Sequence, residues 1–359
     1  MVFELREYTK SQVRKAGNIL KDVNKASEEE LLFAMTALIN FRAIHGYPLN
    51  TFQSTLRTRL KSVSKTAIVA QRIKRLPTIL AKLQRFPQMQ LDRMQDIGGL
   101  RAIVANSSEL DEIYSLYKSA KRFPHKLVEE KDYLHHPKDS GYRGRHLVYQ
   151  YNSHTSNNYN YNGLRIEIQL RTRLQHTWAT AVETFEAFLG EKFKSSIGNK
   201  NMLEFFTFVS SAFALMEKQP VLVAHEQLTR RDIFLKIAQD VSTLDIQNKI
   251  QSFSIVTKHI VQSDDTGYGV LTLDPSKKSV QFLPYRKTMY KEAYERYTQE
   301  EHWSKESDNR QVVLVQADSV KQLKKAYPNY FADLSDFSTK LKVICKEAEA
   351  MAEAMAEGK

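Results

Sequence analysis

An alternating run in the middle of the chain constrains the fold more than any other feature. Over residues 164–171, aliphatic and polar side chains strictly alternate. Successive side chains of a strand point to opposite faces of a sheet, so this run has one apolar and one polar face. The apolar face carries Leu164, Ile166, Ile168 and Leu170, and the polar face carries Arg165, Glu167, Gln169 and Arg171. The pattern predicts a sheet that is buried on one side and presents a carboxylate on the other.

A second acid, Asp96, lies in another strand-like run, so we expect the two acids on separate strands. Asp96 comes shortly before residues 99–105, which form an apolar stretch typical of a buried strand. If the two strands are neighbours, Asp96 and Glu167 form a pair of carboxylates, and Mg²⁺ is commonly held by one or two carboxylates together with substrate phosphates. Either acid alone is more often a structural ion-pair partner. We therefore predict a magnesium site formed by Asp96 and Glu167, with both acids catalytic.

The region before these acids is strongly basic. Residues 31–91 contain no Asp or Glu, and the whole chain has a formal net charge of +12. A polyphosphate or a nucleic acid would neutralise such a cluster, although a solvated helical face is the simpler alternative. The ten cations of this region are Arg42, Arg57, Arg59, Lys61, Lys65, Arg72, Lys74, Arg75, Lys82 and Arg85.

Further basic residues surround a tyrosine in the loop at residues 137–146. Tyr142 lies there among Lys and Arg and close to Gly141, and such a tyrosine can stack on a nucleobase or serve as a half-buried anchor. Walker-type glycine loops, His-Glu-x-x-His and Gly-x-Ser-x-Gly motifs are absent from the sequence. The single cysteine, Cys345, excludes an intrachain disulfide and a cysteine-built zinc site. With no apolar span or signal peptide, we expect a cytoplasmic protein without membrane contact.

The remaining patterns predict an α/β (α+β) protein in which helices flank a mixed sheet. A capping box at Ser27 begins a helix over residues 28–44, and helices are expected over about 172–191 and 201–217. Four strand-like runs follow residue 250. We expect an arm at 1–27, a catalytic domain at 28–220, a helical linker at 221–250, a small α+β domain at 251–346 and a tail at 347–359.

From about Leu31 to Glu191 the chain resembles the synthetase domain of the RelA/SpoT family of nucleotide pyrophosphokinases. The motifs are Arg72-Ile-Lys74 with Lys82, Asp96-x-x-Gly99-x-Arg101, Lys131-Asp-Tyr, Pro137-Lys138-x-x-Gly141-Tyr142-x-x-x-His146, and Glu167-x-Gln169-x-Arg171-Thr172. The resemblance implies transfer of the β,γ-pyrophosphate of ATP to a ribose 3′-hydroxyl, with Mg²⁺ as cofactor. The family's hydrolase domain carries a His-Asp pair for a metal, and no such dipeptide occurs here, so we expect synthesis without hydrolysis.

The same resemblance implies a role for each motif residue. Asp96 holds the metal, and Glu167 holds the metal, activates the acceptor hydroxyl, or both. Gln169 and Arg171 support the site. The phosphates of ATP are bound by Arg72, Lys74, Lys82 and Arg101. The acceptor is oriented by Lys131, Lys138, Tyr142, Arg145 and His146, with Tyr142 stacked on its base.

The acceptor stays open at this point. One branch of the family modifies GDP or GTP to make alarmones, and the toxic small alarmone synthetases modify the 3′ CCA end of tRNA. The β-rich C-terminal part, with residues 326–331, looks like CapRel-type fused toxin–antitoxin proteins, in which this part restrains the enzyme until a phage protein binds. There Tyr294 and Tyr297 are expected to cover the ATP site, or else to pack in their own small core. A third alternative is a degenerate fold that only binds RNA.

Overall fold

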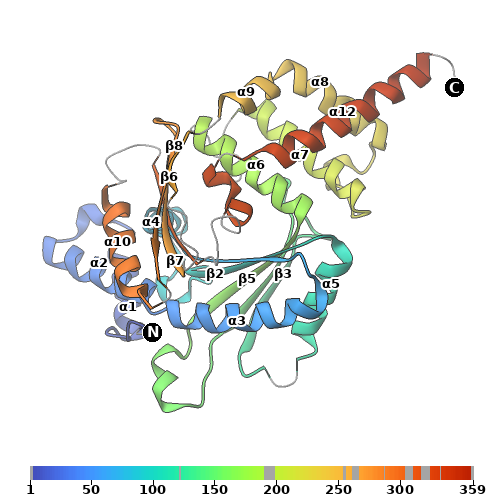
Figure 1. Cartoon of the computed structure of the whole chain (residues 1–359). Coiled ribbons are helices and arrows are strands. Elements are labelled where there is room, and N and C mark those ends of the chain that lie inside the picture. The colour runs from blue at the N-terminus through green and yellow to red at the C-terminus, as the bar shows by residue number, and fades with distance from the viewer. Residues whose placement is uncertain are drawn as a thin grey trace.

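The chain folds around one nine-stranded mixed sheet with the strand order β3-β4-β5-β2-β1-β9-β7-β8-β6 (Figure 1). The computed structural model describes residues 3–120, 123–189, 199–253, 256–260, 267–286, 288–303, 310–316, 324–331 and 333–356. Helices cover both faces of the sheet, with α3 (Gly46–Val63) on one side and α6 (Arg173–Leu189) on the other. The predicted fold class, a mixed sheet flanked by helices, is confirmed.

Five strands make up the half of the sheet that carries the predicted motifs. The strand β2 runs parallel to β5, whereas β1–β2, β3–β4 and β4–β5 are antiparallel pairs. The predicted alternating strand is β5, and it lies between β4 and β2. The bounds are Ile68–Ile73 for β1, Gly98–Val104 for β2, Lys126–Asp132 for β3, Arg145–Gln150 for β4 and Arg165–Thr172 for β5.

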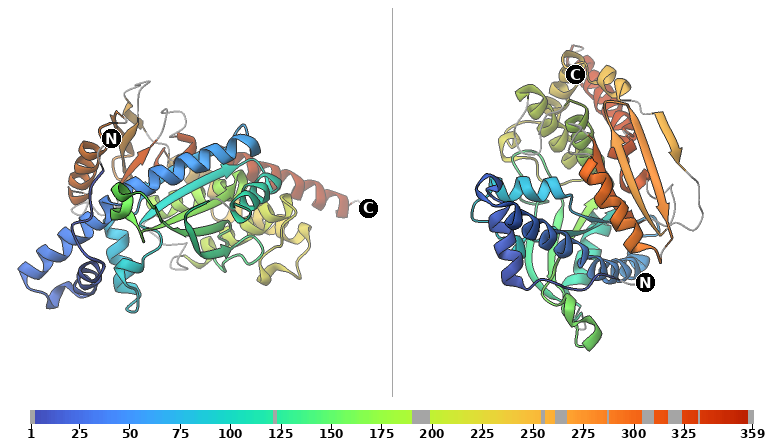
Figure 2. Two further views of the ribbon diagram at one scale, coloured as in Figure 1. Left: turned by 90° about the horizontal axis from the view of Figure 1, so that it is seen from below. Right: turned by 90° about the vertical axis from the view of Figure 1, so that its left-hand side faces the viewer.

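The C-terminal strands extend this same sheet. The strand β9 pairs with β1 through Gln71 opposite Gln316 and Arg72 opposite Val315, and β7 pairs with β9 along most of its length. The four strands expected after residue 250 are therefore present, and they continue the half of the sheet that carries the predicted motifs (Figure 2). The domain boundary near residue 250 stays a prediction. The bounds are Val256–Ile260 for β6, Tyr268–Asp274 for β7, Ser279–Tyr285 for β8 and Gln311–Gln316 for β9.

The helices lie around this sheet and in a separate helical layer. Against the motif half lie α1 (Lys10–Ile19), α2 (Glu28–Ala43), α3, α4 (Leu76–Arg85) and α5 (Ser107–Lys118). The helical layer consists of α6, α7 (Lys200–Met216), α8 (Arg230–Thr243), α9 (Ile246–Ser252) and α12 (Ser335–Ala356). The helix α10 (Tyr290–Trp303) packs on β7 and β9. Short 3₁₀ helices include η1 (Val23–Lys25), η2 (Leu91–Arg93), η3 (Ser156–Tyr161), η5 (Val223–His225) and η7 (Pro328–Phe331).

Two predicted helices illustrate how local signals fixed these elements. The expected capping box is present at the start of α2, where Ser27 and Glu30 bond each other's backbone N–H groups. The helix α12 continues through Ala356, so residues 347–356, expected as a tail, lengthen it. No helix in the described part of the chain is both long and apolar enough to cross a membrane.

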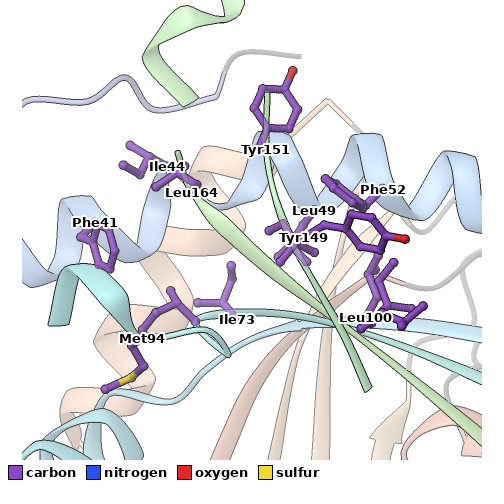
Figure 3. Close-up of a cluster of buried hydrophobic side chains, with 14 of the residues drawn as sticks. Phe41, Ile44, Leu49, Phe52, Ile73, Met94, Leu100, Tyr149, Tyr151 and Leu164 are labelled. Atoms are coloured by element: carbon purple, nitrogen blue, oxygen red, sulfur yellow. The ribbon is translucent and has the colours of Figure 1, made fainter. Parts of the chain in front are cut away.

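The apolar face of the sheet packs on α3 and α5 to form the main core. Ile166, Ile168 and Leu170 of β5 are fully buried there, as the alternation predicts (Figure 3 shows part of this core). The approach of α3 is close: a Cβ added at Gly98 would lie 3.1 Å from Leu49 Cγ. The glycine lets α3 lie directly on one face of β2. The opposite face of β2 and β5 is left for polar side chains.

Candidate active site

The two predicted acids lie at the same end of neighbouring strands. Glu167 in β5 is opposite Gly99 in β2, and Asp96 precedes β2 by two residues. Asp96 is therefore in the segment that leads into the strand, and its placement within a strand run was wrong. The two acids are nevertheless close to each other, as expected. The negative charge of Asp96 acts to raise the pKa of Glu167.

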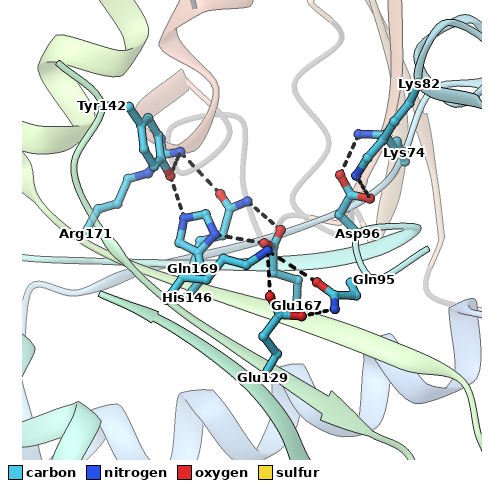
Figure 4. Close-up of polar contacts among 11 residues, drawn as sticks. Lys74, Lys82, Gln95, Asp96, Glu129, Tyr142, His146, Glu167, Gln169 and Arg171 are labelled. Carbon is cyan, nitrogen blue, oxygen red and sulfur yellow. Dashed lines mark hydrogen bonds and ion pairs between the residues drawn. The ribbon is translucent and has the colours of Figure 1, made fainter. Parts of the chain in front are cut away.

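Asp96 is held by two lysines. Lys74, just after β1, donates from Nζ to Oδ2 at 2.7 Å, and Lys82 of α4 donates to Oδ1 at 3.0 Å. Burial acts to raise the pKa of Asp96, but the charges of the two lysines outweigh it and hold that pKa well below its usual range. The side chains of all three remain between 13% and 28% exposed. We call these three residues, which Figure 4 shows bonded to one another, the open cluster, because their side chains are partly exposed.

Glu167 is held by polar neighbours on the same sheet face. His146 Nδ1 lies 2.8 Å from Oε1, and Gln169 Nε2 donates to Oε2 at 2.8 Å. Burial acts to raise the pKa of Glu167, yet the hydrogen bond and positive charge of His146 lower it to about 2. The carboxylate is ionised at neutral pH and fixed in orientation, as a charge-binding group requires.

A hydrogen-bonded chain continues from Glu167 to a buried tyrosine. His146 Nε2 lies 2.6 Å from the Tyr142 hydroxyl, which also accepts from Arg171 Nη2 at 2.8 Å (Figure 4). Burial acts to raise the pKa of Tyr142, but the positive charges of Arg171 and His146 lower it to about 7. Arg171 Nη2 also contacts Gln169 Oε1 at 3.3 Å. Five of the predicted residues thus form one network: Tyr142, His146, Glu167, Gln169 and Arg171.

The loop that carries Tyr142 is fixed from behind by α7. Gly141 has a φ of +89°, and its carbonyl accepts from Ser210 Oγ at 2.6 Å. Tyr142 is 8% exposed, and Lys138 Nζ lies 5.3 Å from the centre of its ring. The edge of Tyr133 faces the same ring at a centroid distance of 5.7 Å. Stacking of Tyr142 on an acceptor base stays a prediction, and it requires Lys138 to move aside.

Sequence reasoning missed two residues beside Glu167. Gln95 donates to Glu129, which also pairs with Lys131 at 3.1 Å, and Lys131 Nζ lies 3.4 Å from Gln95 Oε1. Lys131 faces the site from β3 opposite His146, as its motif implies. The period-two pattern of β3 was the available signal, because it places Glu129 and Lys131 on one face.

Two arginines extend the polar face away from the acids. Arg72 of β1 is exposed, and Arg101 of β2 is 7% exposed with no hydrogen-bond partner for Nε in the described part of the chain. Burial and the nearby Arg171 lower the pKa of Arg101 to about 10. Tyr327 and Tyr330 lie within electrostatic reach of Arg72, and the Tyr327 hydroxyl donates to the Gln71 carbonyl at 2.5 Å.

One predicted acceptor residue is not brought to this face. Arg145 pairs with Leu170, so it points to the opposite side of the sheet from His146. Its guanidinium bonds Asp111 of α5 at 3.2 Å and Asp132 at 3.0 Å, and it stacks on the Tyr114 ring. A role of Arg145 in acceptor binding stays a prediction, and these contacts give it no support.

Tyr294 and Tyr297 also lie apart from the open cluster. The Tyr294 hydroxyl donates to the Ile39 carbonyl at 3.1 Å, and Tyr297 is fully buried. The Tyr297 hydroxyl accepts from Arg42 Nη2 at 2.7 Å and donates to Glu301 at 2.9 Å. Their packing between α10 and α2 is the alternative left open above, and occlusion of the ATP site by this pair stays a prediction.

Acids from distant parts of the chain neutralise part of the basic region. Arg42 pairs with Glu301 at 2.9 Å, and Lys74 and Lys82 share Asp96. Arg59 instead lies over the rings of Tyr117 and Phe123. Two carboxylates are thus shared by three of these four cations, and the chain itself neutralises part of their charge. The described residues contain no cluster of three or more His, Cys, Asp or Glu side chains arranged to hold a metal.

Comparison with known proteins identifies the region that carries this site. Residues 71–186 match the family model described as "Region found in RelA / SpoT proteins". GTP pyrophosphokinase YjbM of Bacillus subtilis (strain 168) is 32% identical over 139 residues, which are 38% of this chain and 62% of that protein. GTP pyrophosphokinase YwaC of the same strain is 28% identical over 172 residues, which are 45% of this chain and 75% of that protein.

Solved structures give more distant similarities. The crystal structure of small alarmone synthetase 1 from Bacillus subtilis is 20% identical, covers 59% of this chain and 96% of its own, and has a TM-score of 0.41. A GTP pyrophosphokinase family protein from Streptococcus pneumoniae is 24% identical, covers 48% of this chain and 85% of its own, and has a TM-score of 0.39. The segment that matches the family model, residues 71–186, contains both acids of the site and strands β2 to β5.

Proposed function

We propose that the chain is a pyrophosphokinase that transfers the β,γ-pyrophosphate of ATP to a ribose 3′-hydroxyl. The observation that carries this proposal is the placement of Asp96 and Glu167 at one end of neighbouring strands, with Lys74 and Lys82 bonded to Asp96. The RelA/SpoT region over residues 71–186 and the two curated relatives, both named GTP pyrophosphokinases, support the same activity. No hydrolase activity is expected.

In this reaction the 3′-oxygen attacks the β-phosphorus of ATP. The bond from the β-phosphorus to the α,β-bridging oxygen breaks, AMP leaves with that oxygen, and the hydroxyl proton passes to a base. The charge that develops on the phosphates needs fixed cations. Lys74, Lys82, Arg72 and Arg101 present these cations on one face of β1, β2 and α4.

The side chains at the site suit Mg²⁺. This ion keeps several waters and is usually bound by one or two carboxylates together with substrate phosphates, so Asp96 and Glu167 are a sufficient protein donor set. When bound, Mg²⁺ would neutralise phosphate charge during the transfer. Lys74 and Lys82 would then exchange Asp96 for the phosphates, because their ion pairs are partly exposed.

The environment of Glu167 supports charge binding over general-base catalysis. A general base works best when its pKa is close to the working pH, and the pKa of Glu167 is lowered to about 2. We therefore assign Glu167 to charge binding. His146 lies between Glu167 and Tyr142 and would keep the carboxylate oriented.

For the acceptor we propose the 3′ CCA end of tRNA, which makes the chain a translation-blocking toxin. The net charge of +12 supports a polyanionic acceptor. Arg75 and Arg85 beside the open cluster take part in no ion pair among the described residues, and they extend the cationic surface beyond the ATP phosphates. GDP or GTP is the second candidate, and the names of the curated relatives favour it.

The C-terminal part would restrain this activity until a trigger such as a phage protein binds it. Tyr327 and Tyr330 are buried against β1, beside Arg72 and Arg101. A segment in this position competes with ATP for the polar face, which supports restraint by residues 324–331. The contacts of Tyr294 and Tyr297 favour a structural role for that pair.

A labelling experiment tests the proposal. The full chain is incubated with ATP labelled in the γ-phosphate and with deacylated tRNA, GDP or GTP in separate reactions. We expect label at the tRNA 3′ end and formation of AMP. Label in GDP or GTP alone would make the chain an alarmone synthetase. Binding of tRNA with no labelled product in any reaction would contradict enzyme activity and support an RNA-binding module.

A further inference from the structure

A cavity lies at the opposite end of β1 from the open cluster. It has a volume of about 760 Å³ and is enclosed by the end of α3, the start of β1, the first turns of α6 and parts of residues 324–337. Ile68 and Val69 at the beginning of β1 line it, whereas Lys74 follows the other end of the strand. Six strand residues span roughly 20 Å, so the two places are separate.

The charge of this cavity is strongly positive. Its described lining contains six cations and two acids, and one of the acids, Asp333, already accepts from Ser335 Oγ at 2.6 Å. Among the described residues, Lys61, Lys65, Arg173 and Lys325 form no ion pair, although acids of the chain neutralise other cations of the same basic region. The six cations are Arg57, Lys61, Lys65, Arg173, Lys324 and Lys325. We call this site the basic cavity.

Two buried side chains in its wall have polar atoms without a partner in the described structure. Ser64 is 9% exposed and His176 is 7% exposed, and both Ser64 Oγ and His176 Nδ1 lack a hydrogen bond. His176 Nε2 lies 3.3 Å from the Lys325 carbonyl, which only accepts, so Nε2 carries the proton and Nδ1 is an acceptor. Burial lowers the pKa of His176 well below its ordinary value, so the ring is neutral.

These groups together specify the chemistry of a ligand. Lysine and arginine side chains bind phosphate oxygens, and the His176 acceptor needs a donor such as a ribose hydroxyl or a base N–H. A buried polar atom without a partner is unfavourable by about 1–3 kcal/mol, and a ligand that supplies the missing bond removes this cost. A volume of about 760 Å³ is within the range of small-molecule sites, which favours a mononucleotide over an RNA strand.

We infer that the basic cavity binds a nucleotide, with its phosphates between Lys61, Lys65 and Lys324 and its sugar or base on His176. The nucleotide would bridge two parts of the chain, because Lys61 and Lys65 lie at and just after the end of α3, whereas Lys324 and Lys325 precede η7. Cations on the two sides repel each other, and a bound polyanion would hold residues 324–331 in place. This regulatory consequence rests on the proposed function, whereas the binding itself does not.

Calorimetric titration of the full chain with ATP, and separately with inorganic triphosphate, tests the inference. The cavity variant carries Lys61→Ala, Lys65→Ala and Lys324→Ala, and the active-site variant carries Lys82→Ala. A matched control removes three charges from α12 by Lys340→Ala, Lys342→Ala and Lys346→Ala. Thermal unfolding of each variant verifies that it is folded. Binding is measured without turnover, so its failure is distinct from failure of the pyrophosphokinase proposal.

We expect ATP binding at the basic cavity to appear as an event that the cavity variant weakens at least tenfold. Lys82→Ala and the α12 control should leave this event unchanged. His176→Ala should weaken this event for ATP by about fivefold and leave triphosphate unaffected, because only the nucleotide has a donor for Nδ1. Unchanged ATP binding in the cavity variant overturns the inference. Loss of binding to a short RNA, with ATP and triphosphate binding intact, would also overturn it and would assign the cations to an RNA surface.

Discussion

Two charged clusters hold the turn between β1 and α4, and they differ in burial. On one side, the open cluster of Lys74, Lys82 and Asp96 is partly exposed and faces the polar side of the sheet. On the other side, Arg42 of α2 is paired with Glu301 of α10 at 2.9 Å, and their side chains are 0% and 2% exposed. We call Arg42, Tyr297 and Glu301 the buried cluster.

The buried cluster binds the backbone of the turn between β1 and α4. The side chain of Lys74, in the same turn, belongs to the open cluster. Arg42 Nε donates to the Lys74 carbonyl at 3.1 Å, and the Leu76 N–H donates to Glu301 Oε1 at 2.6 Å. A helix from the C-terminal part therefore completes the hydrogen bonding at the first residue of α4, which carries Lys82. The C-terminal part is in this way a structural component of the proposed ATP site.

The comparison separates exchangeable charges from fixed ones. Water and phosphates compete for partly exposed ion pairs, so the open cluster can exchange partners at little cost. A buried ion pair that loses one partner leaves an unpaired charge in a medium of low dielectric constant, which is strongly unfavourable. We conclude that the open cluster serves the reaction and that the buried cluster keeps the turn in position.

The largest expected effect concerns activity. Asp96→Asn removes a charge of the open cluster, and we expect transfer to fall by at least about 10⁴-fold, or about 5.5 kcal/mol of activation free energy. Stability should fall by less than in the buried cluster, because the ion pairs of the open cluster are partly exposed. Product formation and urea unfolding measure the two effects. Glu130→Gln, which changes an acid on the other face of β3, is the control and should remain active.

The second effect concerns stability. Arg42→Met leaves Glu301 buried without its cation, and we expect the free energy of unfolding to fall by about 3–5 kcal/mol. Arg230→Met is the matched control, because its pair with Glu347 is 40% and 38% exposed, and a loss of about 0–1 kcal/mol is expected there. Adding Glu301→Gln to Arg42→Met should recover part of the loss. Equal losses in the two single variants would contradict the distinction between the clusters.

The third effect concerns the acid sensitivity contributed by Glu167. Its pKa is about 2 in the folded chain against an ordinary value of 4.5, so its stabilisation is present above pH 4.5 and is lost as the pH falls toward 2. Compared with Glu167→Gln, the wild type should lose about 1–2 kcal/mol more stability between pH 4.5 and about pH 3. Parallel urea titrations of both proteins provide the measurement, and identical pH dependence would remove Glu167 from the ionised network.

The strand that carries Glu167 and its polar face were predictable from the sequence, whereas the buried cluster was not. The alternation over residues 164–171 predicts the strand, the face of Glu167 and the buried Ile166 and Ile168. By contrast, Arg42 and Glu301 are separated by 259 positions, and no local pattern links them. Strand β1 was also missed, because its Arg72 and the surrounding cations were interpreted as one basic stretch.

The smallest expected effect concerns the basal transfer rate and a pair of tyrosines near Arg72. Tyr327→Ala with Tyr330→Ala removes side chains that cover the polar face beside Arg72. If residues 324–331 restrain the site, basal transfer should rise by about fivefold, or about 1 kcal/mol. Initial rates at limiting ATP measure this change.

Tyr294→Ala with Tyr297→Ala is the matched tyrosine pair for this measurement. Tyr297 belongs to the buried cluster, so this change should lower stability and, through the Lys74 turn, lower transfer as well. A rise in transfer for the Tyr327 and Tyr330 change, together with a fall for the Tyr294 and Tyr297 change, would assign restraint to residues 324–331. The same result would assign support of the Lys74 turn to the buried cluster. A rise in transfer from the Tyr294 and Tyr297 change alone would instead assign the restraint to α10. Loss of side chains that only support the Lys74 turn would lower the transfer rate and would not raise it.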